Sequence, residues 1–359
     1  MSYTSLPPFA SPLTDRRMRH DDLLLPKVSI IVTNYNYSRF IVQTLRSVAR
    51  QSYQNWECIV VDDLSTDDSR ERIWRFIDEE EIPSGKFRVI ERKTNGGQLS
   101  AFMEGFRVSV GEFVMMLDSD DILLNDFLQT HVEHHLGNYP VAFTSSNQYQ
   151  IDGKGAVVSG DHADHQSKGA LTLISRASFQ HGYWIWATSS SMVFRSDMIR
   201  LILPDNDSIF RICVDYYLAN FANLLGGSLL IPTIHGCYRR HGGNNFGSHP
   251  VLGAINSVGD LSKHPPHDDF RQAFMQHVLS RHEQFEALLT PIGFCQFFLR
   301  VATLKELFGF LKAYPHIFNK SRAYYLIQLF KFEKNRLDLK MPYMKTTVNL
   351  HPLPSSATK

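Results

Sequence analysis

The acidic run from Asp118 to Asp121, with the sequence DSDD, is the segment best suited to chemistry. It follows the apolar segment from Phe113 to Leu117, which predicts that three carboxylates emerge together at the end of a buried strand. Such crowding is unfavourable without a cation. Mg²⁺ and similar hard ions use one or two protein carboxylates together with substrate phosphates. The alternative is an acidic turn that caps the next helix.

Polar side chains also follow two other predicted strands. Asp62 and Asp63 end one apolar run, and Thr33 and Tyr35 end another. One aspartate could accept a hydrogen bond from a base N–H while the other orients its loop, and Thr33 and Tyr35 could add a hydroxyl contact and an aromatic wall. The alternatives are turn formation for the aspartates and packing for Tyr35.

A glycine-rich turn, from Asn95 to Gly97, opens a predicted helix. Its backbone N–H groups could face a phosphate, since the start of a helix favours anions. A glycine pair alone is more often only a turn.

Asp215 lies among apolar residues near the start of another predicted helix. A carboxylate in this setting is either a favourable charge at a helix N-terminus or a general base with a tuned pKa. The local sequence leaves both interpretations open.

The segment from Tyr238 to Asn245, with the sequence YRRHGGNN, combines cationic and imidazole donors with a flexible glycine pair. This composition suits a diphosphate. Arg239 and His241 alternate onto the same side of an extended segment, whereas Arg240 could be a solvated turn residue.

Three histidines, His131, His134 and His135, have a spacing near that of metal ligands on a helix. They lack an accompanying carboxylate motif. We therefore expect them on an exposed helix face.

Strands and helices alternate along the first part of the chain, because apolar β-branched runs are separated by segments with helical spacing. This order predicts a twisted, mostly parallel sheet flanked by helices, whose ligands bind beyond the carboxyl ends of the strands. The predicted strands are Val28 to Thr33, Trp56 to Asp62, Phe87 to Arg92 and Phe113 to Asp118, and the helices are Phe40 to Gln51, one after a capping-box pattern at Ser65 to Asp68, and Gly97 to Ser109.

The pattern becomes less regular after Asn125, the predicted N-cap of a helix that runs to Leu136. A helix-rich appendage is expected from Phe270 to Tyr343. Mixed-sheet strands are predicted around Val141 to Tyr149, Ser191 to Arg195 and Ser228 to Ile231, with a helix from Val214 to Leu225. We expect flexible tails at 1–26 and 344–359, a catalytic domain at 27–246 and a helix-rich region at 247–343.

The composition excludes several classes of protein. The 359 residues include 37 basic and 36 acidic ones, for a formal net charge of +1, so no global field favours nucleic acid. The four cysteines are scattered, which indicates reduced thiols in a cytosolic protein. No segment approaches about 18 uncharged apolar residues, so no membrane span is expected.

Six motifs, in order along the chain, resemble the inverting glycosyltransferases of family 2, which have the GT-A fold. They are VSIIVTNYN at 28–36, IVVDDLSTD at 59–67, NGGQ at 95–98, GEFVMMLDSDD at 111–121, DYYL at 215–218 and YRRHGGN at 238–244. An ordered set is far more specific than any one motif.

The resemblance implies roles for individual residues. Thr33, Tyr35 and Asp63 would line the pocket for the nucleotide base. Asp118 would lie near the ribose, and Asp120 would bind Mn²⁺ or Mg²⁺ at the donor diphosphate.

The resemblance also implies that Asp215 is the catalytic base and that the loop from Tyr238 to Asn244 closes over the diphosphate. In that loop, Arg239 is an expected donor contact and His241 a candidate metal ligand. The remaining donor-binding residues predicted are Asp62, Gly97 and Gln98.

The implied function is transfer of a sugar, with inversion, from a nucleotide-diphosphate donor to an acceptor hydroxyl in polysaccharide, glycan or glycolipid synthesis. A UDP-sugar is favoured by family frequency. Phe102, Met103 and Glu104 depart from the usual pattern, which puts the contacts made there by relatives in doubt. The Gln-x-x-Arg-Trp motif and membrane helices of processive synthases are not found, which indicates transfer of one sugar per encounter.

Two alternatives remain. A sugar-phosphate nucleotidyltransferase also needs acidic metal ligands, but its glycine-rich basic loop after the first strand is replaced here by Thr33 to Asn36. A non-catalytic nucleotide-sugar-binding protein would keep the pocket without turnover.

The C-terminal region carries an apolar stripe with basic neighbours. It could be a peripheral membrane face for a lipid-linked acceptor at the inner side of a membrane. Packing against the catalytic domain or against another subunit of a homo-oligomer is the more frequent use of such a stripe. Its residues are Phe294, Phe297, Phe298, Leu304, Leu307, Phe308 and Leu311, near Arg300, Lys305 and Lys312.

Two tryptophans, Trp184 and Trp186, lie in the segment expected to choose the sugar and the acceptor. We expect one of them to stack on a sugar ring and the other to belong to the core.

Overall fold

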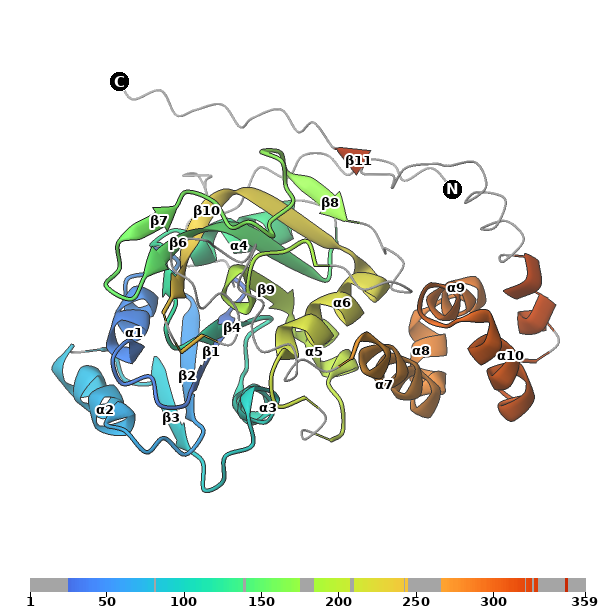
Figure 1. Ribbon diagram of the computed structural model, residues 1–359, viewed down its shortest axis with the longest axis horizontal. Helices are drawn as coiled ribbons and strands as arrows, with labels where there is room; N and C mark the ends of the chain where they lie inside the picture. Colours follow the sequence, from blue (N-terminus) through green and yellow to red (C-terminus); the bar gives the residue numbers. More distant parts are fainter. Residues whose placement is uncertain are drawn as a thin grey trace.

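The computed structural model describes residues 25–80, 82–137, 140–174, 184–206, 210–241, 243–244, 266–319, 321–324, 326–328 and 346–347. The tail predicted at 1–26 lies almost entirely outside these residues, as do most of the segment 344–359 and the part of the helix-rich region at 247–265. The described chain forms a mixed sheet flanked by helices, with further helices at one end of the molecule (Figure 1).

The sheet has the strand order β11-β8-β10-β6-β9-β4-β1-β2-β3, with β5 paired to β10 and β7 to β6. Strands β1 to β4 are parallel to one another, and β6 is parallel to β10, while β9 joins β4 and β6 in an antiparallel sense. The prediction of a mostly parallel, mixed α/β sheet is confirmed. The strands are β1 Val28–Asn34, β2 Trp56–Asp62, β3 Phe87–Glu91, β4 Phe113–Asp118, β5 Ile122–Leu123, β6 Phe143–Asp152, β7 Val157–Ser159, β8 Thr172–Ile174, β9 Met192–Arg195, β10 Ser228–Arg240 and β11 Thr346–Thr347.

Helices cover the sheet because strand β1 is apolar toward both faces. Ile31 packs in one hydrophobic cluster with α3 and α6, whereas Ile30 and Val32 pack in another with α1, α2 and α4. Burial on both faces is typical of parallel strands. The helices are α1 Ile41–Ala49, α2 Ser69–Glu79, α3 Gln98–Val108, α4 Phe127–Gly137, α5 Ser196–Ile202, α6 Val214–Gly226, α7 His267–Ser280, α8 His282–Leu288, α9 Pro291–Val301 and α10 Leu304–Ala313.

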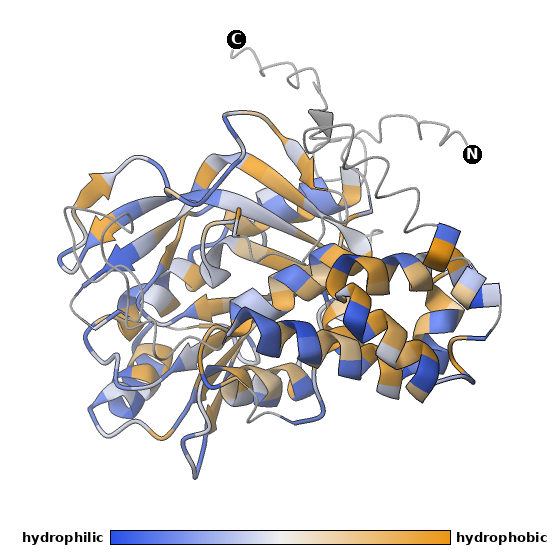
Figure 2. Ribbon diagram, turned by 45° about the vertical axis from the view of Figure 1, so that its right-hand side comes forward, coloured by the Kyte–Doolittle hydropathy of each residue, from blue (hydrophilic) through white to orange (hydrophobic). Residues whose placement is uncertain are grey.

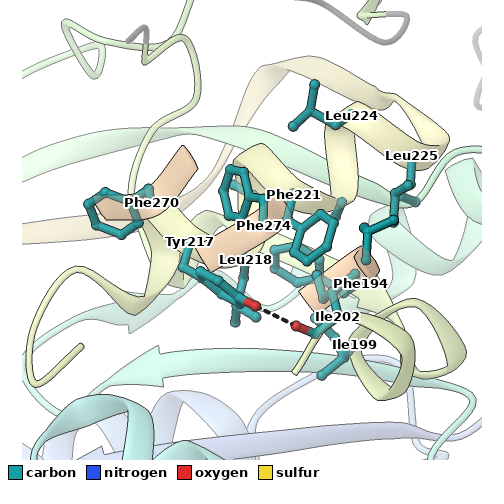
Figure 3. Packing of buried hydrophobic residues seen from close by; sticks show 14 of the residues in the cluster. Phe194, Ile199, Ile202, Tyr217, Leu218, Phe221, Leu224, Leu225, Phe270 and Phe274 are labelled. Carbon is teal, nitrogen blue, oxygen red and sulfur yellow. Dashed lines mark hydrogen bonds between the residues drawn. The ribbon is translucent and has the colours of Figure 1, made fainter. Parts of the chain in front are cut away.

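The C-terminal helices join the sheet through α6. Phe274 of α7 packs against Tyr217 and Phe221 of α6, with ring centroids 4.7 Å apart for Phe221 and Phe274 (Figure 3). Phe270 of α7 packs against Tyr216 of α6, with ring centroids 4.8 Å apart. The Tyr217 hydroxyl donates to the backbone carbonyl of Ile202 at 2.8 Å (Figure 3). The helical C-terminal region is therefore confirmed, and it shares a hydrophobic core with α6.

The apolar stripe of this region is divided between core and surface. Phe294, Phe297 and Phe298 of α9 are buried in the shared core, whereas Leu304 and Phe308 of α10 are exposed. Hydrophobic and hydrophilic residues alternate along these helices (Figure 2). Among the described residues, no helix is long and apolar enough to cross a membrane.

Two local predictions were wrong. Ser65 does not cap α2, which begins at Ser69, because its hydroxyl donates instead to Asp62 Oδ2 at 2.6 Å. The predicted strand from Ser228 extends to Arg240, because β10 pairs with β6 as far as Asp152. Tyr238 to Arg240 is therefore strand and not loop.

The histidines of α4 are also placed differently from the prediction. His131 and His135 are buried, because α4 packs on β6 and β9. The His131 Nδ1 atom lies 2.6 Å from the Thr144 hydroxyl, and His135 Nε2 lies 2.9 Å from the Val193 carbonyl oxygen. The expectation of an exposed face was wrong.

Candidate active site

A cavity of about 1170 Å³ opens beyond the carboxyl ends of β1, β2 and β4. The parallel register explains why the polar strand ends meet, since Thr33 is opposite Asp118 and Asn34 is opposite Asp62. The predicted site residues that line the cavity are Thr33, Tyr35, Asp63, Gly97, Gln98, Asp118, Asp120, Asp215 and His241. Asp62 and Arg239 are not part of the lining.

Asp62 is fully buried and holds the loop after β2. Its carboxylate accepts hydrogen bonds from Asn34 Nδ2 at 2.8 Å and from the Ser65 backbone N–H at 2.8 Å. No oxygen of Asp62 faces the cavity lining, so a direct donor contact is not supported. Of the two neighbouring aspartates, this one orients the loop.

Asp63 lines the cavity and is held by the glycine turn. The backbone N–H groups of Gly96 and Gly97 donate to its Oδ1 and Oδ2 at 3.0 and 2.7 Å, and Arg92 forms an ion pair with Oδ1. The glycine N–H groups therefore bind a carboxylate of this chain, whereas the sequence suggested a phosphate. Arg92 therefore helps to hold Asp63, a role that no local sequence pattern indicated.

Gly97 is required at its position. It has φ of +87°, and a Cβ atom there would lie 2.6 Å from the backbone oxygen of Arg211. Only glycine adopts such a conformation without steric cost. The absence of a side chain also lets the backbone of the Asp63 turn approach Arg211, in the segment before α6. The Gln98 backbone N–H completes this connection by donating to the same Arg211 oxygen at 2.9 Å.

Asp118 lines the cavity and is held by two hydrogen bonds. Gln98 Nε2 donates to its Oδ1 at 2.9 Å and the Ser189 hydroxyl to its Oδ2 at 2.5 Å. Desolvation, together with the negative charges of Asp120 and Asp215, raises the pKa of Asp118 to about 7, against the two hydrogen bonds. The sequence did not indicate Ser189, because its segment is 71 residues from Asp118 along the chain and comes close to it only when β9 pairs with β4.

Asp120 is joined to His241 in a small buried group. His241 Nε2 lies 2.9 Å from Asp120 Oδ2, and the imidazole ring packs on Phe40 and Tyr37 with centroids 4.8 and 5.6 Å away. Asn244 Nδ2 also donates to Asp120 Oδ2, at 3.4 Å.

This donor set fits a divalent cation. Carboxylate oxygen suits Mg²⁺ and Mn²⁺, and imidazole nitrogen is accepted by Mn²⁺ and later transition metals. Within the described ranges, no three His, Cys, Asp or Glu side chains converge as a complete metal site. Asp120 and His241 could therefore hold a cation whose remaining ligands come from substrate and water.

Arg239 supports the acidic run from behind. Its Nε donates to the Asp120 backbone oxygen at 2.7 Å, and its backbone N–H donates to Asp121 Oδ1 at 2.9 Å. Side chains alternate along a strand, so extension of β10 turns Tyr238 and Arg240 toward the cavity and Arg239 away from it. Arg239, which was predicted to contact the donor, is therefore outside the cavity lining, whereas Arg240 is part of it.

Asp215 is the second residue of α6 and lines the cavity. Cys213, which precedes the helix, has φ of +60°, an uncommon conformation for a residue with a side chain. The charge of Asp215 contributes to the raised pKa of Asp118, which indicates that the two carboxyl groups are near each other.

The two tryptophans differ as expected. Trp186 is fully buried in the core, whereas Trp184 lines the cavity. The ring of Trp184 stacks on Tyr216, with centroids 5.8 Å apart and an interplanar angle of 16°.

The chain is similar to known glycosyltransferases. Residues 29–195 match the family described as Glycosyl transferase family 2. An uncharacterised glycosyltransferase of Nostoc sp. is 30% identical over 220 residues, which cover 61% of this chain and 66% of that protein. The E. coli UDP-Glc:alpha-D-GlcNAc-diphosphoundecaprenol beta-1,3-glucosyltransferase WfgD is 31% identical over 138 residues, which cover 38% of this chain and 50% of that protein.

The chain thus matches between half and two thirds of the length of these two relatives. The structure of S. aureus TarS 1–349 in complex with UDP-GlcNAc has a TM-score of 0.47 and 16% identity, over 88% of this chain and 93% of that one. The family match spans β1 to β9 and includes Asp63, Asp118 and Asp120, and the Nostoc relative is named for the same class of enzyme. The chain therefore carries a glycosyl transferase family 2 domain, and its mixed α/β sheet is the one expected of the GT-A fold.

Proposed function

We propose that this protein transfers a single sugar, with inversion, from a nucleotide-diphosphate sugar to an acceptor hydroxyl. The observation that supports the proposal is the placement of Asp63, Asp118, Asp120 and Asp215 around one cavity. Ligand pockets typically occupy about 300–1,000 Å³. The cavity of about 1170 Å³ therefore has room for a donor and part of an acceptor.

In the proposed donor pose, the nucleotide base lies between Tyr35 and Asp63, and the ribose lies near Asp118. Asp120 and His241 hold Mn²⁺ or Mg²⁺, which when bound supplies Lewis-acid stabilisation to the diphosphate. Arg240, which lines this part of the cavity, adds a positive charge.

Asp215 is proposed as the general base. Its carboxylate takes the proton of the acceptor hydroxyl while that oxygen bonds to the anomeric carbon. The bond from the anomeric carbon to the diphosphate oxygen breaks on the opposite face, and the nucleoside diphosphate leaves with the electron pair. One displacement of this kind inverts the anomeric configuration.

A UDP-sugar and a glycan or lipid-linked acceptor are the substrates that we favour. The name of the E. coli relative states a UDP-glucose donor and a diphosphoundecaprenol-linked acceptor, and that relative is 31% identical over 138 residues. We infer the catalytic unit to be residues 27–246, with 247–343 as its helical appendage, since the residues of the cavity all lie in the first range.

We place the reaction in a reducing compartment such as the cytoplasm, because all four cysteines are free and buried.

Peripheral contact with the inner face of a membrane is supported by α10, where Phe308 is 69% exposed near Lys305 and Lys312. Flotation with anionic liposomes tests this contact, and a Phe308→Ser variant should float less. Light scattering of the same samples would reveal a homo-oligomer.

The test of the function is turnover of a panel of UDP-, GDP- and dTDP-sugars by the full chain with Mn²⁺ or Mg²⁺. Release of the nucleoside diphosphate and an inverted anomeric signal in NMR are expected. Pyrophosphate release from a nucleoside triphosphate and a sugar phosphate would indicate a nucleotidyltransferase instead. Donor binding without any turnover would indicate a non-catalytic protein.

A further inference from the structure

An aromatic wall, formed by Trp184 and Tyr216, borders the cavity next to the proposed base. Tyr216 follows Asp215 directly in the chain, and both residues line the cavity together with Trp184. The two aromatic rings stack on each other, with centroids 5.8 Å apart and an interplanar angle of 16°, and so form one aromatic pair at the cavity.

The wall is held from behind by other side chains. Trp184 Nε1 donates to the Ala187 carbonyl at 2.9 Å, and the ring of Trp186 meets Trp184 edge-on at 5.3 Å. Phe270 of α7 packs against Tyr216 with centroids 4.8 Å apart. The rings are therefore fixed by the core and by the C-terminal helices, as a preformed binding surface requires.

A carboxylate lies on the neighbouring loop. Asp164 lines the same cavity, and its loop is joined to the Trp184 segment by a hydrogen bond from the Gln166 N–H to the Ile185 oxygen at 3.0 Å. A pyranose ring presents an apolar C–H face and a rim of hydroxyl groups. An aromatic pair and a carboxylate in the lining of one cavity match both features, since a ring face buries apolar area and a carboxylate accepts from hydroxyls.

The wall and the donor groups are carried by different elements. Asp63, Asp120 and His241 lie at strand ends and in the turn after β10, whereas the wall lies beside the start of α6. The acceptor is the substrate that must reach the base, so a surface next to Asp215 faces the acceptor.

We propose that Trp184 and Tyr216 bind a pyranose ring of the acceptor, with Asp164 accepting a hydrogen bond from one of its hydroxyls. The acceptor is accordingly a glycan or glycolipid that ends in a sugar, and its reactive hydroxyl is directed toward Asp215. This inference rests on the proposed function, because it assigns the second substrate of the same reaction.

The experiment compares two reactions of the full chain, hydrolysis of the donor by water and transfer to octyl glycosides of glucose, galactose, mannose and N-acetylglucosamine. Substitution Trp184→Leu should raise KM for the preferred octyl glycoside about tenfold, the order expected for loss of one aromatic contact of about 1.5 kcal/mol. The ratio of transfer to hydrolysis should fall by the same factor. Trp184→Phe should recover part of the loss.

Trp74 provides the matched control. It is 45% exposed on α2, and its side chain donates to Glu91 away from the cavity. Trp74→Leu should leave both reactions unchanged. The comparison shows that the effect of Trp184→Leu comes from the loss of a binding surface and not from the replacement of a tryptophan in general.

The outcomes distinguish the two levels of the proposal. If no donor is turned over, the proposed function itself fails. If donor is hydrolysed but no octyl glycoside increases turnover, the function stands and the sugar acceptor is refuted. An unchanged KM in Trp184→Leu, with transfer intact, would equally refute the aromatic subsite.

Discussion

Replacement of Asp215 by asparagine is the sharpest test of the proposed base. The carboxylate of Asp215 accepts a hydrogen bond from the Tyr216 backbone N–H at 2.9 Å, and an asparagine side-chain oxygen can accept the same bond. The start of α6 should therefore be retained while the proton acceptor is lost.

The size of the effect follows from the role. General-base catalysis contributes about 10²–10⁴-fold, or about 2.7–5.4 kcal/mol of activation free energy. Asp215→Asn should reduce kcat by this factor, whereas donor affinity should change little because the donor-binding groups are on other elements.

The assay is nucleoside diphosphate release at saturating acceptor, with donor affinity measured by calorimetry. Asp197→Asn is the matched control, since the side chain of Asp197 is 95% exposed and paired with Arg200 at the surface. Turnover of Asp215→Asn within tenfold of wild type would refute the assignment.

Four further predictions concern metal, turn, pH and core. Asp120→Ala should abolish the Mn²⁺-dependent part of donor binding in calorimetry, and equal binding with and without Mn²⁺ in the wild type would contradict the metal role. Gly97→Ala should destabilise the fold by about 1–3 kcal/mol in denaturant unfolding and raise donor KM, because its φ is +87° and the Cβ atom meets backbone. Burial lowers the pKa of both His135 and His162 to about 3, so the unfolded chain binds more protons below about pH 6.5 and stability should fall as pH drops from 6.5 toward 3; a flat stability between pH 7 and 5 would disagree. Phe274→Ala should cost about 3–5 kcal/mol in thermal or denaturant unfolding, since its ring fills the core between α6 and α7, and a loss under 1 kcal/mol would contradict that packing.

The sequence alone predicted the elements that carry the site, because their patterns are local. The apolar runs of β1, β2 and β4 and the order of strands and helices predict a parallel sheet, and a parallel sheet brings its carboxyl ends to one edge. The meeting of Asp63 and Asp118 at a single cavity followed from that topology.

Contacts between distant segments decided what each side chain does. The local sequence is compatible with either Asp62 or Asp63 facing a ligand. The hydrogen bond from Asn34 to Asp62 assigns Asp62 to the loop, and the hydrogen bond from Gly97 to Asp63 holds Asp63 at the cavity. The burial of His131 similarly depends on α4 packing against β6.

The segment from Tyr238 to Asn245 shows most clearly what the sequence predicts and what the tertiary structure decides. Its composition predicted a cationic site for a diphosphate, and Arg240 and His241 of this segment line the cavity. Which arginine faces the cavity depended on where β10 ends, and β10 ends at Arg240 because β6, some 90 residues earlier in sequence, pairs with it as far as Asp152. Since side chains alternate along a strand, pairing with a remote partner fixes the direction of each side chain, and no local pattern contains that information.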